Sequence, residues 1–303
     1  MITLLALFFD NLLPILLIAA SGYLLGQWLD IDPRSISRVV FYIFSPFLFF
    51  DLLVHSQVDG SEMFQIMGFT AAQMILIGLI VWMITRIFKL DRKTTAAVLL
   101  TTIFMNAGNF GLSLTSFAFG QEALAHASIF FVTMALIAYT GGVAIASLGA
   151  FDVRETLRSL TKVPTIYAAL IAFLFVILDW QLPTPLERTT SLLSDATIPG
   201  MLVVLGLQLQ RMQRTWEWKA LALAGGMRII GAPLLAIGTA PLFGLGGTAY
   251  QAGIIEASMP TAVLTIVLAT EYNIKPTLVT TVVFTTTLLS PFTLTPLLAY
   301  LGA

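Results

Sequence analysis

Two short polar interruptions stand in otherwise apolar stretches of this chain. Residues 106–111 read Asn-Ala-Gly-Asn-Phe-Gly, where two glycines weaken a helix and two asparagines can satisfy loose backbone groups. Residues 258–261 read Ser-Met-Pro-Thr, where proline removes one N–H and leaves a carbonyl about one turn earlier without its partner. In hydrocarbon each free backbone group costs several kcal/mol, so a helix breaks there only where the freed groups face protein, water or a ligand.

The chemistry that such breaks offer is anion binding. A half-helix that begins after a break presents free N–H groups and about half a positive charge at its N-terminus. A carboxylate fits there, and asparagine amides add donors without a full cation. The alternatives are tight small-residue packing around the glycines and an ordinary proline kink. We expect six substrate-binding residues: Asn106, Gly108, Asn109, Met259, Pro260 and Thr261.

Three charged residues form a second group of candidates, with roles in coupling or charge pairing. A lone ion at mid-bilayer costs at least ~2.5–3.5 kcal/mol on insertion scales. Arg228 either pairs with a carboxylate or caps freed carbonyls, or it attracts an anion into the pathway. Glu256, about one turn before Pro260, either titrates as protons are coupled to transport or pairs with Arg228. Asp51 lies near the end of its helix, where a structural role is the alternative to coupling.

The amino-acid composition indicates that these residues lie in a membrane protein. Of the 303 residues 58% are apolar and 10% charged, and the mean hydropathy is +0.93. A globular protein needs roughly 25% charged residues to cover its surface. The chain is therefore predicted to be an integral protein of the cell inner membrane, in contact with the lipid bilayer.

Several function classes are disfavoured by what the sequence lacks. The net charge of -1 gives no indication of a nucleic-acid partner, and the absence of cysteine excludes disulfides and thiolate metal sites. No other ligand stands at a suitable spacing from His55 or His126, so we expect no metal and no cofactor. Neither a nucleotide-binding Gly-x-x-x-x-Gly-Lys loop nor a hydrolase motif occurs, so ATP-driven transport and an enzyme are not expected.

The apolar windows predict ten transmembrane helices. The N-terminus lacks the basic region and cleavage site of a secretory signal and is expected to begin the first helix. Thirteen of the 15 basic residues fall in alternate connections, which predicts that both termini are periplasmic or extracellular. The windows are 5–29, 34–54, 63–88, 95–119, 122–149, 163–180, 188–210, 217–243, 248–272 and 276–301.

Weak internal echoes predict that the halves are inverted repeats. Pro14 in the first window matches Pro164 in the sixth, and Pro46 in the second matches Pro199 in the seventh. The breaks in windows 4 and 9 also correspond. Because each half holds an odd number of helices, the second is inserted upside down relative to the first. The expected units are 1–149, with helices 1–5, and 150–303, with helices 6–10.

The chain resembles the auxin efflux carrier family, including its bacterial members. Residues 104–112, Phe-Met-Asn-Ala-Gly-Asn-Phe-Gly-Leu, are similar to the family's Asn-x-Gly-Asn-x-Gly-Leu-Pro signature in helix 4. Residues 257–263, Ala-Ser-Met-Pro-Thr-Ala-Val, look like its helix 9 signature. The likeness spans the whole chain. One departure is Ser113, where the family usually has proline, so the second half of this break is expected to be softer.

The resemblance implies an inverted-repeat fold shared with sodium/bile-acid symporters, with broken helices 4 and 9 crossing, a homodimer, and organic anions as substrates. The predicted function is a secondary transporter, an exporter of a small organic anion such as a carboxylate, working by alternating access at that crossing. Helices 1, 2, 6 and 7 are the expected scaffold, and helices 3–5 and 8–10 the transport unit. The alternative is a membrane sensor or channel that uses the same anion site. Protons, sodium or the membrane potential remain open as the energy source.

Overall fold

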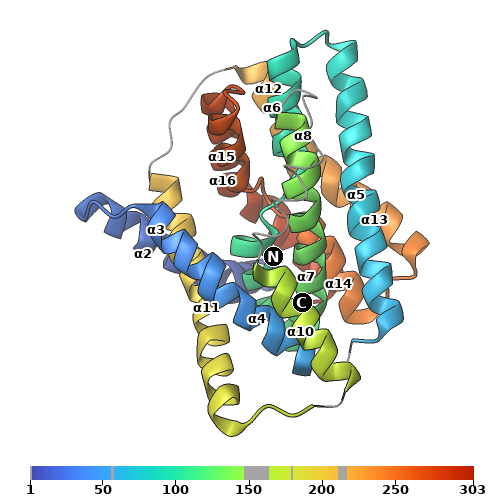
Figure 1. Ribbon diagram of the computed structural model, residues 1–303. Coiled ribbons are helices and arrows are strands. Elements are labelled where there is room, and N and C mark those ends of the chain that lie inside the picture. The colour runs from blue at the N-terminus through green and yellow to red at the C-terminus, as the bar shows by residue number, and fades with distance from the viewer. Residues whose placement is uncertain (1, 56–57, 147–163, 179, 211–216) are drawn as a thin grey trace.

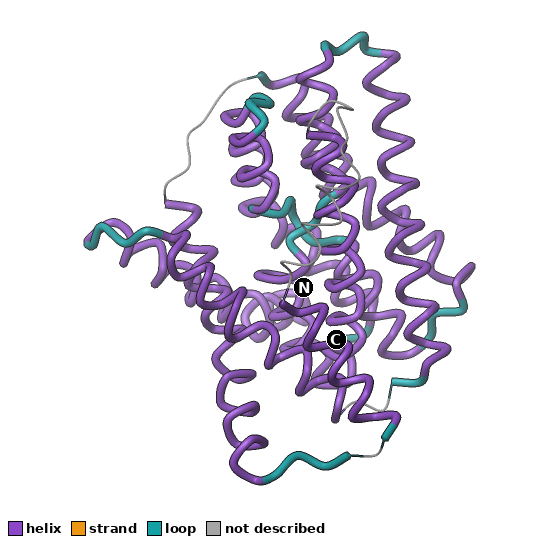
Figure 2. Tube along the Cα trace, viewed as in Figure 1, coloured by secondary structure: helices purple, strands orange, loops and turns teal. Residues whose placement is uncertain are grey.

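The fold is entirely helical wherever the structure describes it. The computed structural model describes residues 2–55, 58–146, 164–178, 180–210 and 217–303. Within these ranges helices are joined by short loops, and no named strand occurs (Figure 2). The predicted all-helical class is therefore confirmed.

Many helices contain a local change of winding, from α-helix to π-helix or 3₁₀-helix. In chain order the elements are α1 Ile2–Leu7, η1 Phe8–Leu12, α2 Leu13–Trp28, α3 Pro33–Val39, η2 Val40–Phe44, α4 Ser45–His55, α5 Gly60–Ile87, α6 Arg92–Ile103, η3 Ala107–Leu112, α7 Ser113–Ile137, η4 Ala138–Gly142, α8 Val143–Ala146, α10 Pro164–Ile177, α11 Thr184–Gln210, α12 Trp218–Gly226, η5 Met227–Gly231, α13 Ala232–Thr239, η6 Ala240–Phe243, α14 Gly247–Ala257, α15 Leu264–Glu271 and α16 Pro276–Leu301 (Figure 1).

Seven helical stretches of the described chain are long and apolar enough to cross a membrane: Leu4–Trp28, Pro33–His55, Gly60–Ile87, Ala107–Ile137, Thr184–Gln210, Trp218–Phe243 and Pro276–Leu301. The remaining expected windows fall on shorter helices, namely α6, α10, α14 and α15. The chain is thus a multi-pass membrane protein.

Two boundaries of the helices bear on the expected windows. Gly120 has φ 77° and ψ -166°, which are not helical angles, so it separates two helices within the range of α7. The sequence windows place a boundary at the same point, between 119 and 122. Helix α11 begins at Thr184, four residues before the expected start of its window, because Pro185 suits the first turn of a helix. The part of window 5 after residue 146 lies outside the described residues.

One side of the molecule is held together by close backbone approach. Helices α2, α3, α4, α10 and α11 pack on one another toward the lower left of Figure 1, and α2 with α11 is the most extensive of these pairs. A Cβ atom built on Gly22 would overlap the carbonyl of Val203, and one on Gly206 would overlap the carbonyl of Ala19. Small residues that let helix backbones touch in this way are typical of membrane interfaces.

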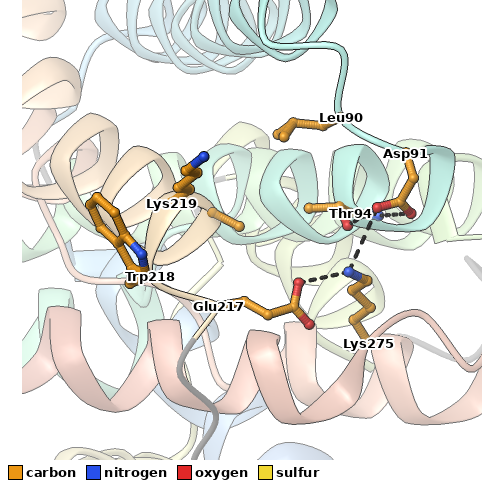
Figure 3. Close-up of a pocket in the computed structure, with 8 residues that line it drawn as sticks. Leu90, Asp91, Thr94, Glu217, Trp218, Lys219 and Lys275 are labelled. Atoms are coloured by element: carbon orange, nitrogen blue, oxygen red, sulfur yellow. Dashed lines mark hydrogen bonds and ion pairs between the residues drawn. The ribbon is translucent and has the colours of Figure 1, made fainter.

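An ionic cluster ties three connections together at one end of the molecule. Lys275, just before α16, donates to Glu217 at 2.6 Å and lies 3.6 Å from Asp91, around a cavity of about 300 Å³ (Figure 3). Burial alone would lower the pKa of Lys275, but Glu217 and Asp91 outweigh that effect and raise the pKa above 10.5. The hydrogen bond from the Thr94 hydroxyl lowers the pKa of Asp91.

We expect Gly206→Ala to destabilise the protein, because the new methyl group meets backbone of α2 that cannot rotate away. Overpacking of this kind costs about 1–3 kcal/mol, which thermal unfolding in detergent would detect as a lower Tm. The matched control is Gly238→Ala on α13, where a Cβ meets nothing within 4 Å. It should leave the Tm unchanged or raise it. Equal Tm values for both variants would contradict the close approach.

Lys275→Met should lower the free energy of unfolding by at most about 1 kcal/mol, because its partners are largely exposed. A lysine whose folded-state pKa is raised stabilises below its unfolded pKa and loses that effect as pH rises through the folded value. The difference in Tm from wild type should therefore be constant near neutral pH and shrink only above about 10.5. Lys219→Met, an exposed lysine on the same cavity, is the control. A difference that vanishes at neutral pH would contradict the ion pairs.

Candidate functional site

Both helices that were predicted to break are interrupted. Helix α6 ends at Ile103, residues 104–106 are not helical, and η3 begins at Ala107. Helix α14 ends at Ala257, and α15 begins only at Leu264. Glycine and proline explain the breaks locally, since residues 106–111 carry two glycines and residue 260 cannot donate a backbone N–H.

The two interruptions are bonded directly to each other. Met105 and Thr261 form an isolated antiparallel bridge. The backbone N–H of Asn106 donates to the carbonyl of Pro260 at 2.7 Å, and that of Ala262 donates to Phe104 at 2.9 Å. These bonds satisfy backbone groups that neither helix can satisfy alone, so each break supports the other.

Arg228 caps the C-terminal ends of both half-helices. It lies in η5 with no exposed surface. Its guanidinium donates through Nη1 to the carbonyl of Thr102, in the last turn of α6, at 2.7 Å, and through Nη2 to that of Ala257, the last residue of α14. Helix C-termini carry about half a negative charge each, so one cation stabilises two of them.

Of the two structural roles expected for Arg228, an ion pair and a carbonyl cap, the geometry shows the cap. A carbonyl cap is present, and no ion pair joins Arg228 to Glu256. Side chains complete the capping: Thr261 donates its hydroxyl to the carbonyl of Thr101 at 2.7 Å. Near this junction the Nε of Arg228 is buried and has no hydrogen-bond partner.

The N-terminal end of η3 keeps free donors. The carbonyl of Asn106 accepts from Phe110 at 3.3 Å and from Gly111 at 3.0 Å, which closes the first π-helical turn. The backbone N–H groups of residues 107–109 have no acceptor within this turn, because first-turn donors have none in a helix. At α15 the corresponding turn is tighter, since Thr265 and Ile266 donate to Ala262 and Val263 at 3.1 and 2.9 Å.

Asn106, Gly108 and Asn109, at this N-terminus, differ in burial and in their contacts. Asn106 is 4% exposed, and its side-chain Nδ2 is buried without a hydrogen-bond partner. Asn109 is half-buried, and its backbone carbonyl accepts from Ser113 at 3.4 Å. Gly108 packs on the ring of Phe131, where a Cβ would approach to 2.6 Å. An unpaired buried amide beside free N–H groups can donate several hydrogen bonds to one anionic oxygen.

Glu256 packs against the same half-helix at Gly111. It is in the last turn of α14, fully buried, and accepts a hydrogen bond from the Thr115 hydroxyl at 3.1 Å through Oε1. Its Oε2 is buried and has no hydrogen-bond partner. A Cβ atom on Gly111 would overlap this carboxyl group, so Glu256 lies directly against the backbone of η3.

The remaining predicted residues lie at different distances from the junction. Met259 is fully buried within it and donates its N–H to the carbonyl of Glu256 at 3.2 Å. That bond occupies the carbonyl one turn before Pro260. Asp51 pairs with His55 at 3.1 Å within α4, and no hydrogen bond or ion pair joins it to Arg228 or Glu256. The structure thus brings together eight of the nine predicted residues.

Two threonines at the junction were not singled out from the sequence. Thr286 of α16 accepts from the backbone N–H of Thr261 at 3.2 Å, while it donates to the carbonyl of Val282 at 2.8 Å. Thr115 supplies the hydrogen bond to Glu256. The row of threonines in α16 is visible in the sequence, but only the tertiary contact distinguishes Thr286 from its neighbours.

The chain is similar to membrane transporters of archaea and plants. The chain is 28% identical to an uncharacterized transporter of Methanothermobacter thermautotrophicus, over 93% of this chain and 94% of the relative. It is 25% identical to an uncharacterized transporter of Methanocaldococcus jannaschii, with the same shares covered. Auxin efflux carrier component 6 of Arabidopsis thaliana is 30% identical over 42% of this chain and 23% of the plant protein.

A sequence model of the family described as membrane transport protein matches residues 7–155 and 150–298. These two segments cover nearly the whole chain, and the family includes the auxin efflux carriers, so the resemblance seen in the sequence is confirmed. Transport across a membrane, rather than an enzymatic reaction, is the activity of this family. The chain belongs to the membrane transport protein family of the auxin efflux carriers.

Proposed function

We propose that this protein is a secondary transporter that exports a small organic anion, and that the anion binds where the two interrupted helices meet. The observation that carries the proposal is the start of η3, where the buried amide of Asn106 lacks a partner beside first-turn N–H groups. A carboxylate would satisfy these donors together. The plant relatives are named as efflux carriers, which favours the outward direction.

Electrostatics at the junction supports an anion over a cation or a neutral solute. The partial negative charges at the C-terminal ends of α6 and α14 are compensated by Arg228, which donates a hydrogen bond to each end. The positive ends of η3 and α15 have no acidic side chain in their first turns. When Glu256, which lies against η3, is protonated, the field at the junction is positive on the N-terminal side, which attracts negative charge.

The order of elements supports the finer architecture of ten crossings. Windows 1 to 10 correspond to α1–α2, α3–α4, α5, α6 with η3 and α7 up to Gly120, α7 after Gly120 with α8, α10, α11, α12–η6, α14–α15 and α16. We propose that helices 1–5 and 6–10 are inverted repeats, divided near residue 150.

The packing pattern supports the inverted repeat, because its helix pairs come in matching sets. Helix α2 packs on α11, which pairs helix 1 with helix 7, and α10 packs on α4, which pairs helix 6 with helix 2. Exchanging the repeats converts one pair into the other. Likewise α5 with α7 matches α12 with α16. We propose helices 1, 2, 6 and 7 as the scaffold, and the others as the transport unit.

The ionic cluster supports the proposal that the connections rich in Lys and Arg lie on the same side of the membrane. Lys275 joins the connection after helix 9 to Asp91, which lies beside the basic residues after helix 3. We propose that this side is cytoplasmic, so that both termini face the periplasm or the exterior of a cell inner membrane. A homodimer is proposed from the family resemblance alone.

Asn106→Ala should abolish or weaken saturable uptake of organic anions by proteoliposomes, since it removes a donor to a charged group. Such bonds contribute about 1.5–3 kcal/mol, so the apparent affinity should fall about 10-fold or more. The screen uses dicarboxylates, 2-oxo acids, aromatic acids and amino acids, each with and without sodium. Asn11→Ala is the control, because that buried amide only bonds the carbonyl of Leu7 in its own helix.

The same experiment distinguishes the transporter from its alternatives. Accumulation against a gradient supports a secondary transporter. Flux that only dissipates a gradient and does not saturate would indicate a channel, and binding without flux a sensor. Equal uptake by wild type and Asn106→Ala would rule out the proposed site.

Arg228→Met should destabilise the protein and reduce uptake, because two buried carbonyls lose their donors. Each unsatisfied group costs about 1–3 kcal/mol, so the Tm in detergent should fall by several degrees. Arg228→Lys keeps the charge but not the planar pair of donors and should recover little of the stability. A fully stable Arg228→Met with weakened anion binding would favour the role of anion attractant instead of the cap.

A further inference from the structure

Glu256 is a fully buried acid that is not among the groups proposed to bind the anion. Its Oε1 accepts from Thr115 at 3.1 Å, and its Oε2 has no hydrogen-bond partner. The carboxyl group touches the backbone at Gly111, where a Cβ atom would overlap it. Gly111 follows the free N–H groups of residues 107–109 by less than one turn, roughly 5 Å along the axis.

The helices packed around Glu256 offer it no ion pair. The elements η3, α13, α16 and η6, which all pack on α14, contain no acidic or basic residue. Arg228 is bonded to the carbonyls of Thr102 and Ala257 rather than to the acid. Its guanidinium nevertheless bonds the carbonyl of Ala257, the residue next to Glu256, so its positive charge lies near the acid.

The charged groups of α5 and α7 have other contacts. On α7, His126 faces Glu62 of α5 at 3.1 Å, and Glu122 accepts from Thr248 at 3.1 Å. Thr248 is in the first turn of α14, two turns before Glu256. Arg86, in the last turn of α5, lies over the ring of Trp82. None of these groups pairs with Glu256.

We propose that Glu256 is a proton-binding site coupled to the anion site, so that the transported anion and one proton bind together. This inference rests on the proposed function. An anion at the N-terminus of η3 and an ionised Glu256 would place two like charges about one turn apart in an interior that screens poorly. A proton on Glu256 removes that repulsion, and by linkage a bound anion favours the proton to the same extent.

The proposal has a direct consequence for transport. A monovalent anion that moves with one proton carries no net charge, so the membrane potential does not act on it. Export then requires an outward gradient of the anion that exceeds any inward proton gradient. The side chain exchanges only a proton with water and forms no covalent bond. Thr115 holds the carboxyl group against Gly111 in either protonation state, because a hydroxyl can donate to the ionised or the neutral acid.

The test measures half-saturation for radiolabelled pyruvate, 2-oxoglutarate and indole-3-acetate in proteoliposomes, at equal pH on both sides and with the potential clamped at zero. All three are almost fully ionised above pH 6. Half-saturation of wild type should rise about 5- to 150-fold between pH 6 and 8.5, the range typical of coupled sites. Glu256→Gln should keep the low value at every pH. The control Glu271→Gln, an exposed acid at the end of α15, should behave as wild type.

A second variant keeps the test decisive should Glu256→Gln not fold. Thr115→Val has nearly the same shape and removes the hydroxyl that donates to the carboxyl group. The ionised acid loses its donor, so affinity should persist to higher pH than in wild type. Protein-free liposomes correct for passive entry of the weak acids.

The outcomes separate this inference from the proposed function. Saturable uptake that is lost in Asn106→Ala but has the same pH profile in wild type and Glu256→Gln would overturn the proton site alone. Uptake that requires sodium and ignores pH would also overturn it. If wild type takes up none of the three anions nor any acid of the wider screen, the proposed function fails, and the coupled proton site fails with it.

Discussion

The rest of the junction depends on Arg228, whose one guanidinium holds the carbonyl ends of two interrupted helices. A broken helix inside a membrane leaves carbonyls that neither water nor lipid can satisfy. Here the carbonyls of Thr102 and Ala257 share the same side chain, which is itself fully buried. Burying a cation is costly, but the negative ends of two helices and two strong acceptors offset that cost. Neither break would be stable without the other.

The capping is asymmetric, and the proposed chemistry follows from that asymmetry. The C-terminal ends receive Arg228 and the hydroxyl of Thr261, whereas the first N–H groups of η3 have no acceptor within their own turn. The buried amide of Asn106 has no partner at the same place. If the other end is left for a ligand, as proposed, this asymmetry would select a substrate by the sign of its charge.

The breaks could be predicted from the sequence because glycine, asparagine and proline act on the backbone around them, at 106–111 and at 260. The partners of Arg228 could not, since Thr102 is 126 positions away from it in the chain and only packing joins them. For the same reason Thr286 was indistinguishable from the other threonines of α16, all of which can bond to carbonyls of their own helix. The π-helical turn of η3 also left no pattern in the sequence.

The bonds across the junction constrain how a transporter of this shape can move. Asn106 to Pro260, Ala262 to Phe104, and Arg228 to both helix ends tie α6, η3, α14 and α15 into one body. Opening the site by separating these helices would expose several backbone groups at once to hydrocarbon, each at a cost of several kcal/mol. Under the proposed alternating access, the junction would therefore stay intact, and the whole body would shift against α2, α4, α10 and α11. The glycine contact of α2 with α11 lies within that second group, so it can remain locked while the boundary between the groups slides.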